Sequence, residues 1–512
     1  MVGRDSNEEE RTLFFYNNAI PSSDQTTLGF VMEPRIDPAA LPSQTTPLLA
    51  GKTQGECDLP PEPVCTTWKL EVRILSRRSL MLMITSLLQY SLTVASIFSI
   101  GHLGTLELGA VSLASMTANI TGYAVYHGMA TSIDTLCGQA YGSGDKKLVG
   151  LHMQRMVYFL LVITIPIAVI WVFADRILLQ LLSEKDVAIL AGRYLKVLII
   201  GTPGYLSFES GKRFVQAQGI FSAPLVVMVI CAPLNAFMNW LFVWKFEWGF
   251  VGAPVAVVIT NYCLPSVLLA YTSLIVGLEC WNGFTYKAFT NWSVMIKLAI
   301  PGFLMVESEV LAFEILTFAA SHFGKTALAA QAVLSTCVSI AFLIPFPISV
   351  AASTRIANLI GSGSKDAARI AAKVSISGAA GAGFVNATFL YSLREYIPIL
   401  FTSDKEVAEL VARLLPICAS FQIFDALAAS CNGVLRGLGR QTIGGYVQLF
   451  CYYGVAMPLS MGTAFGLGWN LWGLWAGVAM GLLLVCCIEG TFLLRSNWDY
   501  AVRAAKERAT EG

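Results

Sequence analysis

The chain has 512 residues, of which 55% are hydrophobic and only 13% are charged, and its mean hydropathy is +0.63. Soluble domains carry about 25% charged residues, so this composition excludes an ordinary soluble protein and indicates a polytopic membrane protein. The net charge of +1 provides no field that would attract nucleic acid.

The first 66 residues differ from the rest of the chain. They contain eight prolines and many Ser, Thr, Asp and Glu residues. Such a segment buries too little apolar surface to offset its ordering entropy, so we predict a disordered cytoplasmic tail over 1–66. The tail lacks the basic start and apolar centre of a signal peptide. It contains TTPLL (45–49), which resembles a sorting signal and slightly favours a vacuolar membrane over the plasma membrane.

From Ser79 onward the chain is a series of apolar runs of roughly 20 residues, the length a helix needs to cross a hydrocarbon core of about 30 Å. Backbone polar groups cannot stay unpaired in lipid, so runs this long predict helices. We therefore expect an all-α fold with twelve transmembrane helices. The predicted spans are 79–100, 108–132, 154–174, 192–211, 222–244, 250–277, 294–320, 327–352, 374–393, 407–430, 443–465 and 470–494.

A weak internal repeat divides these spans into two sets of six. Three pairs of segments echo one another at an offset of 219 or 220 residues: GHLGTLELGA with SHFGKTALAA (from 101 and 321), GSG with GSG (from 142 and 361), and VQAQG with LRGLG (from 215 and 435). A shared offset indicates a tandem duplication. We predict two six-helix lobes, 67–280 and 281–498, related by a pseudo-two-fold axis, followed by a cytoplasmic tail over 499–512. Such folds bind substrate between the halves and work by rocking them.

Basic residues predict the orientation. Lys and Arg are more than twice as frequent on the side that contains both termini as on the other side. The loops GSGDKK (142–147) and GSGSKDAAR (361–369) carry much of this excess. By the positive-inside rule, both termini lie in the cytoplasm.

Span 294–320 contains three carboxylates, Glu307, Glu309 and Glu314, with no basic residue between Lys297 and Lys325. An ionised carboxylate at the bilayer centre costs about 2.5–3.5 kcal/mol on insertion scales. The three groups must therefore face a cavity, pair with another group, or hold a proton. A site of this kind exchanges protons near neutral pH and, when negative, attracts an organic cation.

Helical geometry sorts the three acids only in part. Glu307 and Glu314 are seven residues apart and share a face, whereas Glu309 lies about 140° from Glu314. Periodicity alone therefore pairs Glu307 with Glu314.

A further acid, Asp425, lies in span 407–430. It is either a free titratable group or the partner of Arg413 or Arg436. No basic residue lies well inside any predicted span.

Several uncharged polar side chains are candidates for lining a cavity. The amides could instead bond across helices, and the tyrosines could stack on a flat cation. The candidates are Gln89, Asn119, Asn235, Asn239, Tyr452 and Tyr453. The cysteines are scattered and the four histidines show no ligand spacing, so we predict neither a metal site nor a catalytic centre.

Five stretches together resemble the multidrug and toxic compound extrusion (MATE) transporters, in a form that looks fungal. The resemblance runs from about Trp68 to Trp498. The stretches are GHLGTLELGAVSLA (101–114), DTLCGQAYGSGD (134–145), AAQAVL (329–334), SVAASTRIANLIGSG (349–363) and GVLRGLGRQ (433–441).

This resemblance implies two six-helix lobes that exchange protons or sodium for organic cations. The family's seventh helix carries two glutamates five residues apart, usually with two tryptophans between them. That pattern falls on Glu309 and Glu314, with Val310 and Leu311 in place of the aromatic pair. The acid of the family's tenth helix matches Asp425. Glu307 is additional to the pattern, and is kept as a further candidate acid.

We therefore predict a proton-coupled antiporter that exports or sequesters organic cations, xenobiotics or small metabolites. We expect it to be a monomer driven by the proton gradient without a cofactor. No GxxxxGK[ST] stretch is present to hold ATP. The alternative is a flippase for lipids or lipid-linked oligosaccharides with a related fold. An integral-membrane enzyme and a channel fit the sequence less well.

Overall fold

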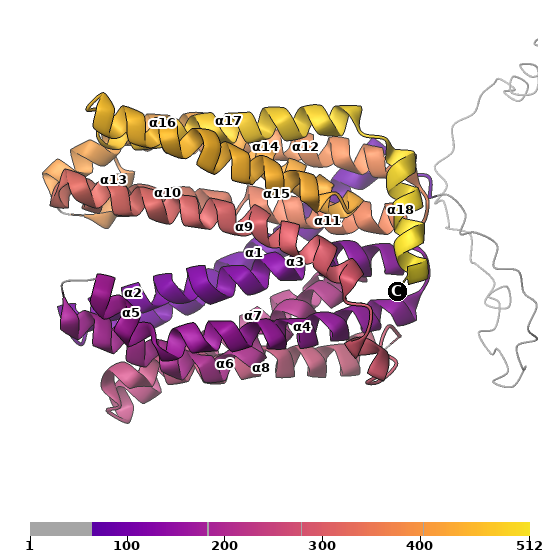
Figure 1. Ribbon diagram of the computed structural model, residues 1–512, viewed down its shortest axis with the longest axis horizontal. Coiled ribbons are helices and arrows are strands. Elements are labelled where there is room, and N and C mark those ends of the chain that lie inside the picture. The colour runs from indigo at the N-terminus through magenta and orange to yellow at the C-terminus, as the bar shows by residue number, and fades with distance from the viewer. Residues whose placement is uncertain (1–63, 182–183, 278, 403, 512) are drawn as a thin grey trace, which may run out of the picture. The chain divides into compact units, whose positions relative to one another are not determined.

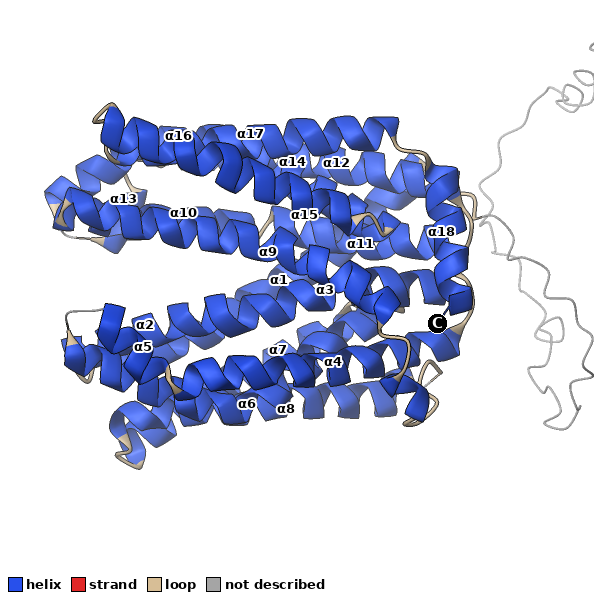
Figure 2. Ribbon diagram, in the orientation of Figure 1, coloured by secondary structure: helices blue, strands red, loops and turns tan. Residues whose placement is uncertain are grey.

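The computed structural model describes residues 64–181, 184–277, 279–402 and 404–511. The described chain is helical, without β-strands (Figure 2). Each predicted span falls on helix. The α-helices are α1 (Trp68–Gly101), α2 (Thr105–Ala118), α3 (Ala124–Gly142), α4 (Lys146–Val172), α5 (Ala174–Leu181), α6 (Lys185–Ala217), α7 (Ser222–Trp240), α8 (Gly252–Tyr271), α9 (Ser293–Ala320), α10 (Lys325–Phe342), α11 (Pro345–Gly361), α12 (Lys365–Ser392), α13 (Ile397–Phe401), α14 (Lys405–Leu438), α15 (Gln441–Leu449), α16 (Met457–Met461), α17 (Leu471–Arg495) and α18 (Trp498–Glu511).

Short π-helical and 3₁₀ segments continue several of these helices. The π-helical segments are Asn119–Tyr123, Leu241–Lys245, Thr272–Val276, Phe450–Ala456 and Gly462–Gly466. The 3₁₀ segments are Gly249–Val251, Tyr286–Phe289 and Ser321–Phe323. The second and eleventh predicted spans are therefore each built from shorter pieces, joined without a break in the chain direction.

Eight helical stretches in the described chain are long and apolar enough to cross a membrane by length and composition alone. Helix α9 does not qualify because Lys297 and three glutamates are spread along it, and α12 is rich in Ala, Gly and Ser. Large apolar side chains such as Phe98, Phe318 and Phe384 point outward and are more than half exposed. Outward-facing apolar side chains on helices of this length are expected of surfaces that contact lipid.

The spans are arranged as two lobes of six, as predicted. In the N-lobe (α1 to α8), α6 packs on α4 and α8, and α1 packs on α7. In the C-lobe (α9 to α17), α14 packs on α11, α12 and α17. Figure 1 shows the two sets of helices meeting beside α18 and spreading apart toward α5 and α13. The contacts between the lobes follow the repeat, in which α1 is equivalent to α9 and α3 to α11. Helix α3 packs on α9, the equivalent α11 packs on α1, and α3 and α11 pack on each other.

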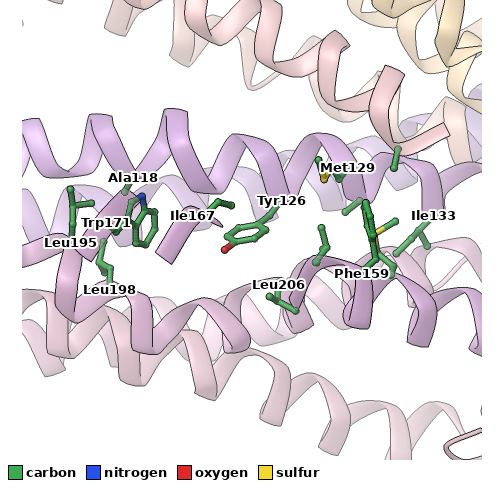
Figure 3. Packing of buried hydrophobic residues seen from close by; sticks show 14 of the residues in the cluster. Ala118, Tyr126, Met129, Ile133, Phe159, Ile167, Trp171, Leu195, Leu198 and Leu206 are labelled. Atoms are coloured by element: carbon green, nitrogen blue, oxygen red, sulfur yellow. The ribbon is translucent and has the colours of Figure 1, made fainter. Parts of the chain in front are cut away.

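The N-lobe core lies between α3, α4 and α6 (Figure 3). Its largest buried side chains each place their polar atom against a threonine. The Trp171 indole N–H donates to Thr121 Oγ1 at 2.7 Å, and the Tyr126 hydroxyl donates to Thr164 Oγ1 at 3.0 Å. Buried aromatic residues need such partners, so these bonds fix how α4 rotates against α3.

Helices α3 and α11 cross at two glycines that occupy equivalent positions in the repeat. A Cβ atom on Gly142 would lie 2.0 Å from the backbone oxygen of Asn358, and one on Gly361 would lie 2.1 Å from the backbone oxygen of Gln139. The contact is therefore reciprocal. Only glycine allows two helix backbones to approach this closely, so the GSG echo in the sequence marks the point where the two lobes touch.

Adding a methyl group at this crossing is expected to destabilise the protein. In Gly142→Ala the obstacle is backbone rather than a flexible side chain, so α3 and α11 must separate, at a cost of about 1–3 kcal/mol. The midpoint of thermal unfolding in detergent should fall. The control is Gly378→Ala in α12, where a Cβ would meet nothing within 4 Å and helix propensity favours alanine. Equal midpoints for the two variants would contradict the close crossing.

The two terminal segments have different outcomes. Of the predicted tail over 1–66, residues 1–63 lie outside the described part. Residues 499–512 were expected only as a tail, but α18 covers them to Glu511 and packs on α3, α11 and α12. Asp499 pairs with Lys365 at 2.6 Å, and the hydrogen bond from Lys365 lowers the pKa of the Asp499 carboxyl below its ordinary value.

Candidate functional site

A cavity of about 790 Å³ lies between the lobes. Its walls come from α1, α2, α3, α6, α7 and α8 on the N-lobe side and from α9, α10, α11, α14 and α17 on the C-lobe side. This volume lies in the range of sites for small organic molecules, about 300–1,000 Å³. Because both lobes line the cavity, rocking one lobe against the other would change its shape.

Helix α9 supplies two of the three predicted glutamates to the cavity. Its lining residues are Met305, Val306, Glu309, Val310, Phe313 and Glu314. They form one broad stripe with a helical repeat, and Glu309 and Glu314 lie toward its opposite edges. The stripe is wide enough to accommodate two residues about 140° apart. Helix α9 is continuous from Ser293 to Ala320, so both glutamates reach the cavity without local unwinding of the helix.

Glu307 is placed differently, and does not line this cavity. Its side chain is half-buried, and its Oε2 atom is buried without a hydrogen-bond partner. It interacts electrostatically with Tyr453, whose hydroxyl donates to the Ser308 carbonyl at 3.3 Å. The pairing of Glu307 with Glu314 that periodicity suggested is therefore wrong for this cavity, which is lined by Glu309 and Glu314 instead.

Asp425 lines the cavity from α14 and is 4% exposed. It forms no ion pair with either arginine considered from the sequence: Arg413 pairs with Glu409, and Arg436 donates to Ser349. It interacts electrostatically with Glu309, which lines the same cavity. Among the described residues, neither acid forms a hydrogen bond or an ion pair, so both carboxyl groups are free to exchange protons with the cavity.

The uncharged candidates divide into two groups. Gln89, Asn119, Asn235 and Tyr452 line the cavity, whereas Asn239 and Tyr453 do not. Asn239 donates to the Asn235 carbonyl at 2.9 Å, and the Asn235 amide donates to Thr260 Oγ1 at 2.9 Å. The second bond links α7 to α8, so Asn235 both lines the cavity and bonds across helices.

A buried charge cluster at the N-lobe wall was not among the predicted site residues, although a local ion pair of Glu209 with Lys212 and Arg213 was one interpretation of the sequence. It consists of His127 and Asp134 on α3 and Glu209, Lys212 and Arg213 on α6. Arg213 bonds Asp134 at 2.8 Å and Glu209 at 3.3 Å, while Glu209 also pairs with Lys212 at 2.8 Å and His127 at 2.9 Å. His127, Lys212 and Arg213 line the cavity.

The expectation that no basic residue lies well inside a span is therefore wrong. The predicted spans ended at 211 and 430, where hydropathy falls, but α6 continues to Ala217 and α14 to Leu438. Lys212, Arg213 and Arg436 are all buried in these extensions. The one signal available was that Glu209 and Arg213 are four residues apart, a spacing that brings opposite charges together on a helix.

Hydrogen bonds between the lobes close the cavity on the side of α18. We call Thr135 and Gln139 of α3 with Arg436, Gly437 and Gln441 the lobe junction. Thr135 Oγ1 donates to the Arg436 carbonyl at 2.5 Å, and the Gln441 amide donates to Thr135 Oγ1 at 2.8 Å. The Gln139 amide donates to the Gly437 carbonyl at 3.2 Å. Opening the cavity on this side requires these bonds to break.

The α18 helix strengthens this closure, because Arg508 donates to Gln139 Oε1 at 2.9 Å. A second contact joins the lobes: Glu71 of α1 forms a bidentate ion pair with Arg355 of α11, with one contact of 2.6 Å. The first contact holds α3 of the N-lobe to α18, and the second holds α1 of the N-lobe to α11 of the C-lobe.

The family model MatE matches the chain twice, over residues 82–241 and 301–461. An uncharacterized transporter of Schizosaccharomyces pombe is 40% identical over 447 residues, covering 87% of this chain and 83% of that protein. Multidrug and toxin extrusion protein 2 of Mus musculus is 36% identical, covering 81% of this chain and 73% of that protein.

The crystal structure of the eukaryotic MATE transporter AtDTX14 is similar, with a TM-score of 0.83 and 29% identity, covering 86% of this chain and 99% of that chain. These relatives are transporters rather than enzymes. The cavity is lined by Lys212, Arg213 and Arg436, so a lack of basic residues is no argument against the flippase alternative. From the repeated match and the two-lobed fold we conclude that this chain belongs to the MATE family of multi-pass membrane transporters.

Proposed function

We propose that this transporter is a proton-coupled antiporter of organic cations or small metabolites. The observation that supports the proposal most directly is the group of three carboxyl side chains, Glu309, Glu314 and Asp425, that line one cavity between the lobes. None of them forms an ion pair within the described chain. Each can therefore be neutralised by a proton or by a bound cation, and the two compete for the same negative charge.

Competition of this kind gives antiport when each ligand favours a different arrangement of the lobes. A ligand shifts a conformational equilibrium only by its difference in affinity for the two states. The lobe junction closes one side of the cavity in this conformation, and its release would expose the other side. Protons and substrate bound alternately at the same acids would then move in opposite directions, driven by the proton gradient without a bound cofactor.

The excess of Lys and Arg on one side favours cytoplasmic termini. In that orientation the lobe junction and α18 lie at the cytoplasmic end, and the cavity faces the vacuolar lumen or the cell exterior. We further propose that the protein acts as a monomer, since each lobe of one chain contributes to the cavity. The vacuolar membrane is slightly favoured over the plasma membrane.

The proposal is tested by gradient-driven uptake in proteoliposomes. An acidic interior is expected to drive uptake of radiolabelled tetraethylammonium, and dissipating the pH gradient with a protonophore should stop it. A sodium gradient of equal size at constant pH should drive no uptake. Uptake that follows the sodium gradient would contradict proton coupling, and uptake with neither gradient would contradict antiport of this cation.

A further inference from the structure

Glu489 of α17 is a buried carboxyl group that the proposed mechanism has not used. It is 0% exposed, and both of its carboxyl oxygens are buried without a hydrogen-bond partner. It lies one turn beyond Val485, which lines the cavity. Glu489 itself does not line it, so the carboxyl group lies behind the cavity wall.

The groups that face Glu489 come from three neighbouring elements and from α17 itself. Among the described residues, the one cation in electrostatic relation to Glu489 is Arg436 of α14, and the one acid is Glu309 of α9. The remaining titratable neighbours are Cys431 on α14, Cys451 and Tyr452 in the π-helical segment after α15, and Cys486 on α17. Helix α16 and the π-helical segment 462–466, which also pack on α17, contribute no titratable residue.

This environment links two parts of the site. On one side, Glu489 interacts with Glu309, which in turn interacts with Asp425. On the other side it interacts with Arg436, whose backbone carbonyl accepts the bond from Thr135 at the lobe junction. Glu489 is thus the one acid among the described residues with an electrostatic relation both to the cavity acids and to the junction.

Arg436 and Glu489 are close enough to interact but are not paired. No ion pair joins them, and the Arg436 Nε atom is also buried without a partner. Burying a carboxylate without a partner is strongly unfavourable, whereas a protonated carboxyl group is tolerated. The geometry therefore fits a proton on Glu489 while the junction is closed. Release of Thr135 from the Arg436 carbonyl would free α14 to move and allow the guanidinium to pair with the carboxylate.

We propose that Glu489 is a second proton-carrying residue. It receives a proton from the Glu309 and Asp425 pair, and it releases that proton to water that enters when the lobe junction opens and Arg436 pairs with its carboxylate. The steps are proton transfers, between carboxyl groups and then to water, with no change in electron count. It rests on the proposed proton-coupled antiport, and assigns to α17 a role in moving protons that is separate from substrate binding.

Two variants test this role against a structural one. Glu489→Gln keeps the shape of the side chain but carries no transferable proton, and Glu489→Asp keeps the carboxyl group. In proteoliposomes, Glu489→Gln is expected to lose uptake of tetraethylammonium driven by a pH gradient, down to the level of empty liposomes. It should retain counterflow of the same cation at equal pH, which needs no net proton movement. Glu489→Asp should retain both activities.

A spectroscopic readout keeps the test informative if a variant is unstable. The infrared spectrum of the wild-type protein in nanodiscs should contain a band from a protonated, buried carboxyl group. That band should disappear in Glu489→Gln and shift in Glu489→Asp. If Glu489→Gln kept pH-driven uptake at the wild-type level, or gave a spectrum identical to that of the wild-type protein, the role of Glu489 would be refuted but the proposed antiport would not. Absence of pH-driven uptake in the wild-type protein would instead refute the proposed antiport.

Discussion

Glu309→Gln and Asp425→Asn are each expected to abolish uptake driven by a pH gradient, in the same proteoliposomes that support uptake by the wild-type protein. The two acids interact with each other and line one cavity, and neither forms a hydrogen bond or an ion pair in the described chain. Interacting carboxyl groups titrate as a pair, so neutralising either one removes the shared site. Glu314→Gln should give the same loss, because its carboxyl group faces the same cavity.

The matched control is Glu307→Gln. Glu307 lies on the same helix only two residues from Glu309, but it does not line the cavity. This variant should retain pH-driven uptake close to the wild-type level. If Glu307→Gln lost uptake while Glu309→Gln kept it, the assignment of the cavity face of α9 would be wrong. If all four variants transported normally, these acids could not be the coupling site.

Arg213→Met is expected to produce the largest loss of stability, about 3–5 kcal/mol, because it breaks a buried ion-pair network from one side. Arg213 is 2% exposed, and its removal leaves Asp134, also 2% exposed, without its ion-pair partner. Glu209 keeps its contacts with Lys212 and His127, so the unpaired charge is chiefly that of Asp134. The loss should appear as a lower midpoint of thermal unfolding in detergent.

Two comparisons separate pairing from general packing. Arg413→Met removes the partner of Glu409 at an exposed position, where both side chains are more than 70% exposed, and should change stability by no more than about 1 kcal/mol. Combining Arg213→Met with Asp134→Asn should recover part of the lost stability, because the orphaned charge is then removed. A double variant less stable than Arg213→Met would show that charge pairing is not the cause.

The number of spans and their division into two lobes could be predicted because each depends on local sequence: run length, hydropathy and a shared offset. Helix ends could not be placed in the same way. Hydropathy falls at Lys212 and Arg436, yet both helices continue past these residues. Each buried side chain has a polar partner, because Lys212 pairs with Glu209 one turn before it and Arg436 donates to Ser349 of α11. Arg213 is 79 residues from Asp134, and no local pattern reveals such a pairing.

The site was predictable to a similar degree. The resemblance gave Glu309 and Glu314, and the structure shows why they can share a cavity despite their helical phase: the cavity borders a broad face of α9. Glu489 and the charge cluster were not predicted as functional, because a buried position near the end of a span cannot be told from an exposed one by composition. Helix α18 was missed because its polar sequence resembles that of a tail.

The reciprocal glycines of α3 and α11 have a consequence for how the halves of this chain are held. Gly142 contacts Asn358, and the equivalent residues Gly361 and Gln139 contact each other in the same way. Such a reciprocal contact is the isologous arrangement found in a two-fold symmetric dimer. One polypeptide thus retains the geometry by which two identical subunits would associate. At this crossing the two halves meet through main-chain atoms, with no side chain between them.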